Sequence, residues 1–395
     1  MTGRSTHLPA DTVTLVARTL SAIAVPRLCA SDGWRRTTRD VRDRLDRLGY
    51  DVTNHDFEFS DWPARFGAPL VGGFISVAFW IAWLAVRAGA PGLALAVLVG
   101  LHVVTALLFI ASERFLLRLP WGRRIGVNLL AVSGPARPRW IVVAHRDSKS
   151  QPLPIALRVI AAALATIVWT MLLAGAAFEI ANVPTPLVST PVAATGIAAG
   201  LILLACTTGN KSPGALDNAS GVAALMGIAA QERGNDDVAF LVTDAEEFGL
   251  AGASAMAGAL AWAEAVINLD GLDDRGPFHL LGRHGTPRRG GAPVIERTFC
   301  ELARFEGEAV HIRNVPRGLA LDHLAFTRAG VPALTVMRGT LRSMLRVHRP
   351  ADHAARITGQ GAALTADLIC RVLDRLRSAG AQPPDPLDYS GKKMG

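Results

Sequence analysis

The chain has 395 residues, half of them hydrophobic, with a net charge of +8 and a mean hydropathy of +0.29. Such a composition excludes an ordinary soluble enzyme, which is less apolar, and indicates segments that lie in a membrane. The basic residues are spread out and form no stripe with interleaved aromatic residues, so we expect no nucleic acid partner. A nearby anionic lipid bilayer explains the charge more simply.

The first 65 residues are polar or amphipathic. Residues 37–48 have the spacing of an amphipathic helix that ends at Gly49, and residues 50–59 alternate like a strand. No basic segment is followed by a short apolar run, so the sequence predicts no cleaved signal peptide.

Two pairs of long apolar runs follow, and each run is long enough to span a bilayer. A short connection joins the runs of each pair, which predicts two antiparallel hairpins; buried core helices are the alternative. Gly196 and Gly200 give the second pair a G-x-x-x-G spacing that permits close helix packing. The four runs are residues 66–86, 88–112, 159–178 and 187–206.

Two complete hairpins return the chain to the side on which it started, so the polar segments should share one compartment. Basic residues concentrate on that side, whereas the opposite turns carry only Arg87 and Glu179. The positive-inside rule therefore predicts an integral protein of a bacterial-type plasma membrane, with four spans and with its polar part in the cytoplasm. The basic flanking residues are Arg65, Arg114, Arg118, Arg123, Arg124, Lys149, Arg158 and Lys211.

The polar segments alternate between predicted strands and predicted helices. This alternation predicts an α/β fold, with a mainly parallel mixed sheet that helices cover on both faces and that the two transmembrane hairpins interrupt. The predicted strands are residues 127–132, 140–144, 238–243, 265–269, 277–281 and 332–337, and the predicted helices are residues 219–233, 250–262, 293–306 and 361–378.

Five side chains of the types that bind zinc stand at the ends of predicted strands or in loops. The aspartates and histidines are each weak signals alone, because a helix-capping aspartate or a surface histidine is the more frequent explanation. Glu247 is more specific, because two adjacent acids before an apolar, glycine-rich turn need a reason. Together, two imidazoles and three carboxylates suit two zinc ions that share one carboxylate and a water. The five residues are His145, Asp217, Glu247, Asp270 and His348.

Two further acids fit beside this set. Glu246 directly precedes Glu247, and two neighbouring carboxylates can divide the work of a hydrolytic site, one binding metal and the other moving a proton. Asp147 lies two residues after His145, where a carboxylate can accept a hydrogen bond from the ring nitrogen that does not bind metal.

With these residues, the chain resembles the co-catalytic zinc exopeptidases of clan MH, which include bacterial leucyl aminopeptidase and glutamate carboxypeptidase. The resemblance covers the N-terminal helix and strand and residues 126–150 and 212–376, and it excludes both hairpins. In the family pattern, one aspartate bridges two zinc ions and each ion has two further ligands. The resemblance implies that the bridging residue is Asp217, that one site is completed by His145 and Asp270, and the other by Glu247 and His348.

The resemblance also implies roles for the remaining candidates. Glu246 would be the general base that takes the proton from a metal-bridging water and passes it to the leaving amine, and Asp147 would orient His145. Asp322 and His323 lie in a segment that resembles the edge of the family's substrate pocket, which implies that they bind substrate.

Three further features concern how the chain follows or departs from the family pattern. The resemblance implies a cis peptide bond between Asp217 and Asn218. The family joins its first histidine to the bridging aspartate by a short loop, whereas 72 positions separate His145 from Asp217 here, because the second hairpin intervenes. No tyrosine matches the one with which many members stabilise the oxyanion, so His323 or an arginine would have to replace it.

The resemblance therefore implies a membrane-anchored dizinc metallo-exopeptidase of the aminopeptidase type, acting on peptides near the membrane surface. A single-zinc glutaminyl cyclase-like acyltransferase and a non-catalytic binding or scaffold protein remain the alternatives. The expected organisation is an N-terminal part of the peptidase domain (1–65), a first transmembrane hairpin (66–112), a segment with the first metal ligand (113–152), a second hairpin (153–207), the main peptidase domain (208–380) and a disordered tail (381–395).

Overall fold

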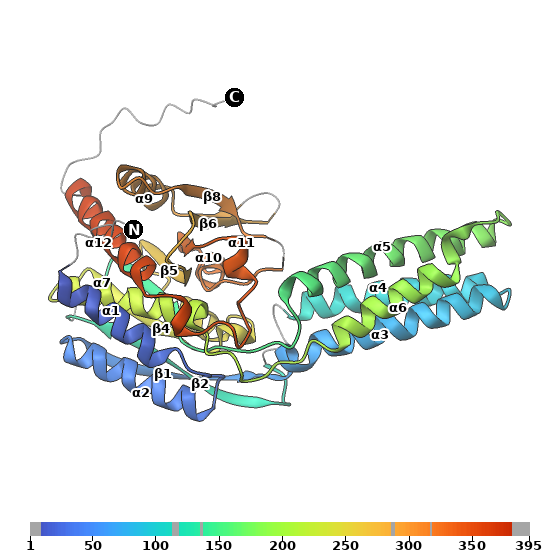
Figure 1. Cartoon of the computed structure of the whole chain (residues 1–395), viewed down its shortest axis with the longest axis horizontal. Helices are drawn as coiled ribbons and strands as arrows, with labels where there is room; N and C mark the ends of the chain where they lie inside the picture. Colours follow the sequence, from blue (N-terminus) through green and yellow to red (C-terminus); the bar gives the residue numbers. More distant parts are fainter. Residues whose placement is uncertain (1–8, 113–117, 135–136, 286–288, 317, 381–395) are drawn as a thin grey trace.

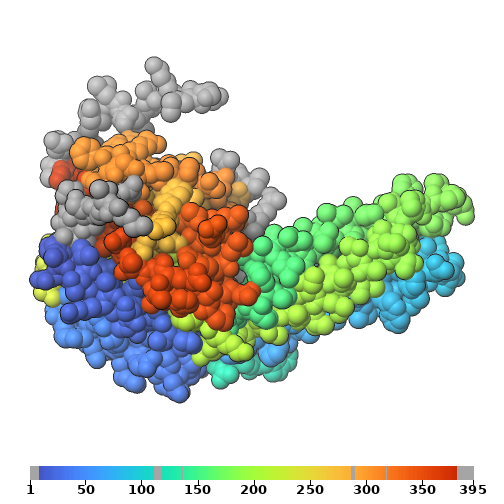
Figure 2. All heavy atoms as spheres, in the orientation of Figure 1, coloured from blue at the N-terminus to red at the C-terminus, as the bar shows by residue number. Residues whose placement is uncertain are grey.

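The computed structural model describes residues 9–112, 118–134, 137–285, 289–316 and 318–380; the expected disordered tail lies outside them. An α/β part with a nine-stranded sheet carries a bundle of four apolar helices at one side (Figure 1). The space-filling view shows this bundle standing out from the rounded α/β part as a rod (Figure 2). The strands are β1 (Asp51–Ser60), β2 (Arg123–Val132), β3 (Trp140–His145), β4 (Val238–Thr243), β5 (Ala265–Leu272), β6 (Phe278–His284), β7 (Arg289–Gly290), β8 (Val310–Asn314) and β9 (Ala333–Arg338).

The helices of the α/β part are α1 (Ala10–Ile23), α2 (Asp32–Arg47), α7 (Ser220–Gln231), α8 (Ala251–Ala257), α9 (Pro293–Phe305), α10 (His323–Arg328), α11 (Leu341–Met344) and α12 (Gln360–Gly380). The bundle consists of α3 (Trp62–Arg87), α4 (Pro91–Ser112), α5 (Ile155–Ile180) and α6 (Thr190–Leu204). Most predicted elements are present. The helix expected over 250–262 ends at Ala257, where Gly258, a poor helix former, begins a turn.

The sheet has the strand order β1-β2-β4-β3-β5-β9-β6-β7, with β8 paired to β6. Its centre, β4-β3-β5-β9, is parallel, whereas β1, β2 and β6 join their neighbours β2, β4 and β9 in antiparallel pairs. The sheet is therefore mixed, and less parallel than the sequence suggested. The first helical hairpin causes part of this difference, because it returns the chain beside its starting point and β2 then pairs with β1 over its whole length.

The central strand β3 shows how the sheet is covered on both faces. All of its residues are buried, and alternate side chains point to opposite faces. Val142 and Ala144 belong to the core that contains α7, which is itself almost wholly buried. Ile141 and Val143 belong to a second core with α8 and α10. This two-sided burial explains the continuous apolar run that predicted the strand.

The bundle corrects the expectation of four membrane spans. The helices α3, α4 and α5 are long and apolar enough to cross a membrane, but α6 has only 15 residues, which is about 22 Å at 1.5 Å per residue. The run expected over 187–206 is shortened because Pro186–Val188 forms a separate 3-10 turn and Pro191 stands at the start of α6.

The short helix α6 lies very close to α3 because small residues line the contact. A Cβ atom added to Gly200 would lie 2.3 Å from Ser76 Oγ, and one added to Gly72 would lie 2.3 Å from the backbone nitrogen of Leu204. Ser76 also donates a hydrogen bond to the carbonyl of Ile197 across the contact, at 3.2 Å. The close packing predicted from the G-x-x-x-G spacing is confirmed.

The second hairpin leaves and re-enters the α/β part at one point. Ser150, before α5, and Gly209, after α6, form an antiparallel bridge with two backbone hydrogen bonds of 2.8 and 2.9 Å. The long insertion between His145 and Asp217 therefore begins and ends at the same place in the α/β part.

Candidate metal centre

Three of the parallel strands deliver acidic or imidazole side chains to one edge of the sheet. His145 is the last residue of β3, and Asp270 lies near the end of the neighbouring strand β5. Glu246 and Glu247 form a 3-10 turn with Phe248 just beyond β4. The carboxyl ends of parallel strands are where α/β proteins place their chemistry.

Two further residues reach the same place from outside the sheet. Asp217 lies in the short turn Ala215–Ala219 that precedes α7, and its peptide bond to Asn218 is cis, as the resemblance implied. His348 comes from the segment after α11 and has a backbone φ of +62°. The structure therefore brings all five predicted ligands together.

The first possible metal site is formed by His145, Asp217 and Asp270. His145 Nε2 lies 3.2 Å from Asp217 Oδ1 and 3.8 Å from Asp270 Oδ2. One donor atom from each residue lies within 4.8 Å of the other two, and all three residues are buried. Three such donors at this spacing are the protein ligands of a catalytic zinc site.

The second possible metal site is formed by Asp217, Glu247 and His348. His348 Nε2 lies 3.0 Å from Asp217 Oδ2 and 3.1 Å from Glu247 Oε2, and the three donors again lie within 4.8 Å of one another. Asp217 thus presents Oδ1 to the first site and Oδ2 to the second. A carboxylate placed in this way can bridge two ions.

The charges of the two sites are strongly coupled. Although burial raises it, the pKa of Asp217 is held well below its usual range by hydrogen bonds from His145 and His348. Burial likewise opposes ionisation of Glu247, but the charges of His348 and Lys149 lower its pKa to about 2. Both carboxylates are therefore ionised at neutral pH, which is the form that binds metal.

Glu246 differs from Glu247 although the two are adjacent. It belongs to neither ligand group, and its Oε2 lies 4.0 Å from His145 Nε2. Burial, and then the charges of Glu247, Asp322 and Asp270, raise the pKa of Glu246 well above its usual range, against the opposing effect of His145. A carboxyl group beside a metal centre with a raised pKa suits proton transfer.

Asp147 occupies the position expected of a residue that orients His145. Its Oδ1 lies 3.4 Å from His145 Nδ1, the ring nitrogen that faces away from the other ligands. Its two oxygens also accept hydrogen bonds of 3.2 Å from the backbone nitrogens of Glu246 and Glu247. One fully buried carboxylate therefore ties the end of β3 to the glutamate turn.

Two supporting residues escaped the sequence reasoning. Asp352 accepts hydrogen bonds from the backbone nitrogens of Leu216 and Asp217, at 2.7 and 3.1 Å, and so fixes the turn that carries the shared carboxylate. Its only signal was its place four residues after His348. The guanidinium of Arg27 is fully buried and donates to the backbone carbonyls of Arg146, Pro213 and Gly214; no local pattern marks it.

Two polar residues between Asp147 and α5 were also missed. Lys149 Nζ lies 2.9 Å from Glu247 Oε2, and Gln151 Oε1 lies 3.2 Å from His348 Nδ1. Sequence reasoning treated Lys149 as a membrane flank and gave Gln151 no role. Their spacing of two residues, directly after the H-x-D motif, was the available signal.

Asp322 and His323, for which the resemblance implied substrate binding, are buried in the structure. Both side chains are 0 % exposed. Asp322 accepts a hydrogen bond from Thr243, and His323 Nδ1 lies 2.6 Å from Thr335 Oγ1. Burial raises the pKa of Asp322 to about 7 and lowers the pKa of His323 to about 3. They support the centre from within the protein.

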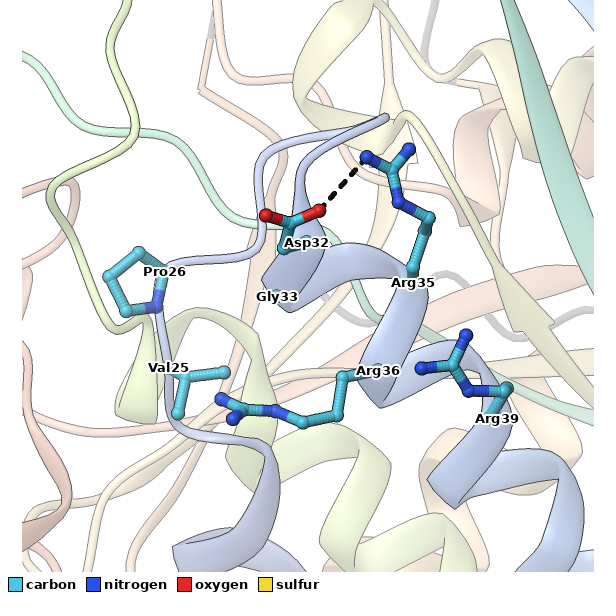
Figure 3. A pocket seen from close by; sticks show the side chains of 7 residues that line it. All are labelled: Val25, Pro26, Asp32, Gly33, Arg35, Arg36 and Arg39. Carbon is cyan, nitrogen blue, oxygen red and sulfur yellow. Dashed lines mark hydrogen bonds and ion pairs between the residues drawn. The ribbon is translucent and has the colours of Figure 1, made fainter.

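A hollow of about 480 Å³ lies elsewhere, at the junction of α1 and α2. Figure 3 shows three arginines of α2 around it, Arg35, Arg36 and Arg39, of which Arg35 pairs with Asp32 at 3.0 Å. All three arginines are exposed, and acids alternate with bases along α2, which is typical of a solvated helix face. The hollow contains none of the candidate ligands, so the edge of the sheet remains the functional site.

The donor set fits zinc. Nitrogen and carboxylate oxygen are ligands that zinc prefers, and each site offers three of them. Glu247 Oε1 is buried and has no hydrogen-bond partner among the described residues, so it also remains available to a cation. Most of the ligands are oriented by neighbours before any ion binds, as Asp147, Asp352 and Gln151 show.

Comparisons with known proteins agree with this centre. The family model "Peptidase family M28" matches residues 195–373. Among solved structures, an aminopeptidase from Aneurinibacillus sp. strain AM-1 is similar with a TM-score of 0.54 at 13 % identity, over 92 % of this chain and 93 % of that one. The zinc aminopeptidase BSAP from Bacillus subtilis gives 0.53 at 13 % identity, over 94 % and 96 %.

Another similar structure is the glutaminyl cyclase of Porphyromonas gingivalis, with a TM-score of 0.54 at 15 % identity over 94 % of this chain and all of that one. No curated protein sequence matches the chain. At these identities the solved structures establish the fold alone. The resemblance inferred from the sequence is confirmed, since the model of peptidase family M28 matches residues 195–373 and the similar structures include zinc aminopeptidases and glutaminyl cyclases.

Proposed function

We propose that the chain is a membrane-anchored, two-zinc exopeptidase of the aminopeptidase type. The family match and the solved neighbours support a zinc-dependent, peptidase-like function. The proposal of two zinc ions rests on the Asp217 carboxylate, because one of its oxygens faces His145 and the other faces His348. With a single metal, one of these two sets of ligands would have no role.

The ligands divide between the two zinc ions in this proposal. Asp217 is shared, His145 and Asp270 hold one ion, and Glu247 and His348 hold the other. When bound, zinc polarises the scissile carbonyl and makes water acidic enough to be deprotonated near neutral pH. The sequence-based assignment of the ligands therefore becomes the proposed centre without change.

Glu246 moves the proton. Its carboxylate takes a proton from the water whose oxygen attacks the carbonyl carbon, and it returns that proton to the nitrogen as the carbon–nitrogen bond breaks. Glu246 is buried beside the metal ligands, where burial raises the pKa of its carboxyl group, so it is placed to hold the proton between the two steps. Asp147 keeps His145 in place, Asp322 accepts a hydrogen bond from Thr243 at the end of β4, and His323 contacts Thr335 within β9.

Three helices support anchoring in a bilayer, with α6 as a shorter partner inside the bundle. Aromatic rings gather where α3 leaves the α/β part, with Trp62 and Trp121 6.4 Å apart and Trp121 63 % exposed, as in the aromatic belts of membrane proteins. We therefore propose that the substrate is a peptide N-terminus presented at the bilayer surface, such as a hydrophobic peptide or a membrane protein, on the cytoplasmic side.

The full chain, purified in detergent and loaded with zinc, should release N-terminal residues from a library of peptides that differ at the first position. After reconstitution into vesicles, it should cleave a lipid-tethered peptide faster than the same peptide free in solution. Inactivity across the library would overturn the peptidase proposal, whereas equal rates on tethered and free peptides would overturn only the membrane-presented substrate.

Glutaminyl cyclisation is the second candidate. The cyclase of Porphyromonas gingivalis matches the chain as well as the aminopeptidase structures do, and Lys149 already neutralises part of the second site through Glu247. A cyclase would release ammonia from peptides that begin with glutamine and leave other peptides intact. One zinc per chain together with this product would replace the two-zinc proposal.

A further inference from the structure

The segment that leads into the membrane helix α5 holds both ligands that are unique to the second site. Lys149 Nζ contacts Glu247 Oε2 at 2.9 Å, and Gln151 Oε1 contacts His348 Nδ1 at 3.2 Å. Side chains two residues apart on an extended segment point to the same side. Ser150, between them, forms the bridge to Gly209 on the far side of the hairpin. The approach to α5 is therefore part of the metal centre.

Gln151 fixes His348 through two separate contacts. Its backbone nitrogen donates to the His348 carbonyl at 2.8 Å, while its side-chain oxygen faces Nδ1. His348 has a φ of +62°, a conformation that is unfavourable for residues other than glycine and that persists only where neighbours enforce it. Because an amide oxygen can only accept, Nδ1 must carry a hydrogen. Nε2, which faces Asp217 and Glu247, is then the nitrogen that can give up its hydrogen and offer its lone pair when a zinc ion binds.

Arg158 determines which end of the Gln151 amide faces the histidine. It lies in the first turn of α5, and its guanidinium donates to the same Oε1 atom. A guanidinium has no acceptor, so it selects the oxygen and excludes the NH2 group from this position. An NH2 group there would face Nδ1 as a donor and favour the tautomer that cannot bind metal through Nε2.

A second contact joins the bundle to the same site. The Arg65 guanidinium, in the first turns of α3, lies 5.9 Å from the ring centre of Phe248, the residue after Glu247. The first site has a different support, since His145 is oriented by Asp147, which belongs to the loop just beyond its own strand.

We propose that Gln151 and Arg158 are positioning residues for the second metal site, through which the membrane helix α5 sets how tightly that site holds zinc. The proposal rests on the two-zinc function. It extends that function by making the affinity for one of the two ions depend on a residue of the membrane bundle.

Zinc titration calorimetry on the full chain in detergent tests this proposal when each site is isolated. A His145→Ala background leaves the second site, and a Glu247→Ala background leaves the first. In the first background, Gln151→Met should weaken zinc binding about 10- to 100-fold, the usual cost of losing the partner that orients a ligand. Arg158→Met should weaken it about 3- to 10-fold, and Gln151→Glu, which keeps an acceptor, should restore affinity.

Two controls separate positioning from general damage. Arg87→Met removes an arginine at the far end of α3, where it contacts only Trp83 among the described contacts, and should change nothing. In the Glu247→Ala background, Gln151→Met should leave the remaining site unaltered. In the zinc-loaded chain, imidazole ¹⁵N shifts should show the His348 hydrogen on Nδ1, and Gln151→Met should disturb this signal alone.

The outcomes separate this proposal from the proposed function. The positioning role would be overturned if both Gln151→Met and Arg158→Met kept wild-type zinc affinity, or if zinc affinity fell equally at the two sites. Neither result would contradict the two-zinc enzyme. Two zinc ions with the expected variant effects but no peptide hydrolysis would overturn the proposed activity alone. A chain that binds no zinc at the Glu247 site would overturn both.

Discussion

The two candidate metal sites share Asp217 but differ in how they are built. The first takes His145 and Asp270 from the ends of β3 and β5, where the side chains are 1 % and 8 % exposed. The second takes Glu247 from a turn and His348 from a loop, and the His348 side chain is 17 % exposed. One site is therefore set by the sheet, and the other by irregular segments that contact the helical bundle.

This difference predicts unequal behaviour of the two ions. Strand ends in a buried sheet move little, so the first site is held in place by the core of the protein. The second site also contains the ammonium group of Lys149, which lies 2.9 Å from Glu247 Oε2 and repels a metal ion there. We expect the first site to bind zinc more tightly than the second.

The largest effect should follow from removing what the sites share. Asp217→Ala leaves each site with two ligands, fewer than the three that catalytic zinc sites use, so bound zinc should fall from two ions per chain to none at micromolar zinc. Metal analysis by mass spectrometry after gel filtration measures this. Retention of one zinc would mean that one site does not use Asp217, and the bridge would be wrong.

Glu246→Gln should leave zinc binding at both sites unchanged and remove turnover. Glu246 is a ligand of neither site, so two zinc ions should remain, while kcat falls about 10²- to 10⁴-fold with the loss of the general base. Steady-state kinetics and zinc content from the same preparation test both parts. If zinc were lost together with activity, Glu246 would be a ligand.

Lys149→Met should bring the zinc affinity of the second site closer to that of the first. Without the ammonium group, zinc no longer competes for Glu247 Oε2, and affinity at the second site should rise about tenfold, or about 1.4 kcal/mol. Calorimetry in the His145→Ala background measures the change, with Lys211→Met as a matched control. A decrease would show that Lys149 supports the site instead of competing with the metal.

The last prediction concerns the stability of the fold around Asp322, behind the first site, and not zinc binding or turnover. Its folded-state pKa of about 7 lies above the ordinary value near 3.8, so ionisation destabilises the fold increasingly as the pH rises from about 4 to 7, by on the order of 4 kcal/mol. In zinc-free protein, Asp322→Asn should therefore raise the Tm by several degrees at pH 8 and leave it unchanged at pH 4. An equal shift at both pH values would contradict the raised pKa.

Much of the first site could be predicted from sequence. The apolar run of β4 matched the structure at residues 238–243, because a strand buried on both faces is hydrophobic throughout. The carboxyl ends of parallel strands meet at one edge of the sheet, so the ligands at strand ends could be expected to lie close together. The family pattern supplied their pairing and the cis peptide bond after Asp217, which no composition or periodicity indicates.

The second site was harder to predict because its supports are contacts between distant segments. Gln151 and His348 are 197 positions apart, and nothing near either residue announces their contact. The burial of Asp322 and His323 depends on Thr243 and Thr335, which also lie on other elements. Similarly, hydropathy identified the run over 187–206 but could not show that proline residues shorten its helix.

The Ser150–Gly209 bridge has a consequence for biosynthesis. His145 leaves the ribosome before the second hairpin and Asp217 after it, so the first site cannot close until α5 and α6 have been made and brought back together. In a bilayer-anchored protein, the metal centre would then be completed only after these helices have reached the membrane. The order of synthesis would by itself keep the metal centre incomplete in a half-made chain.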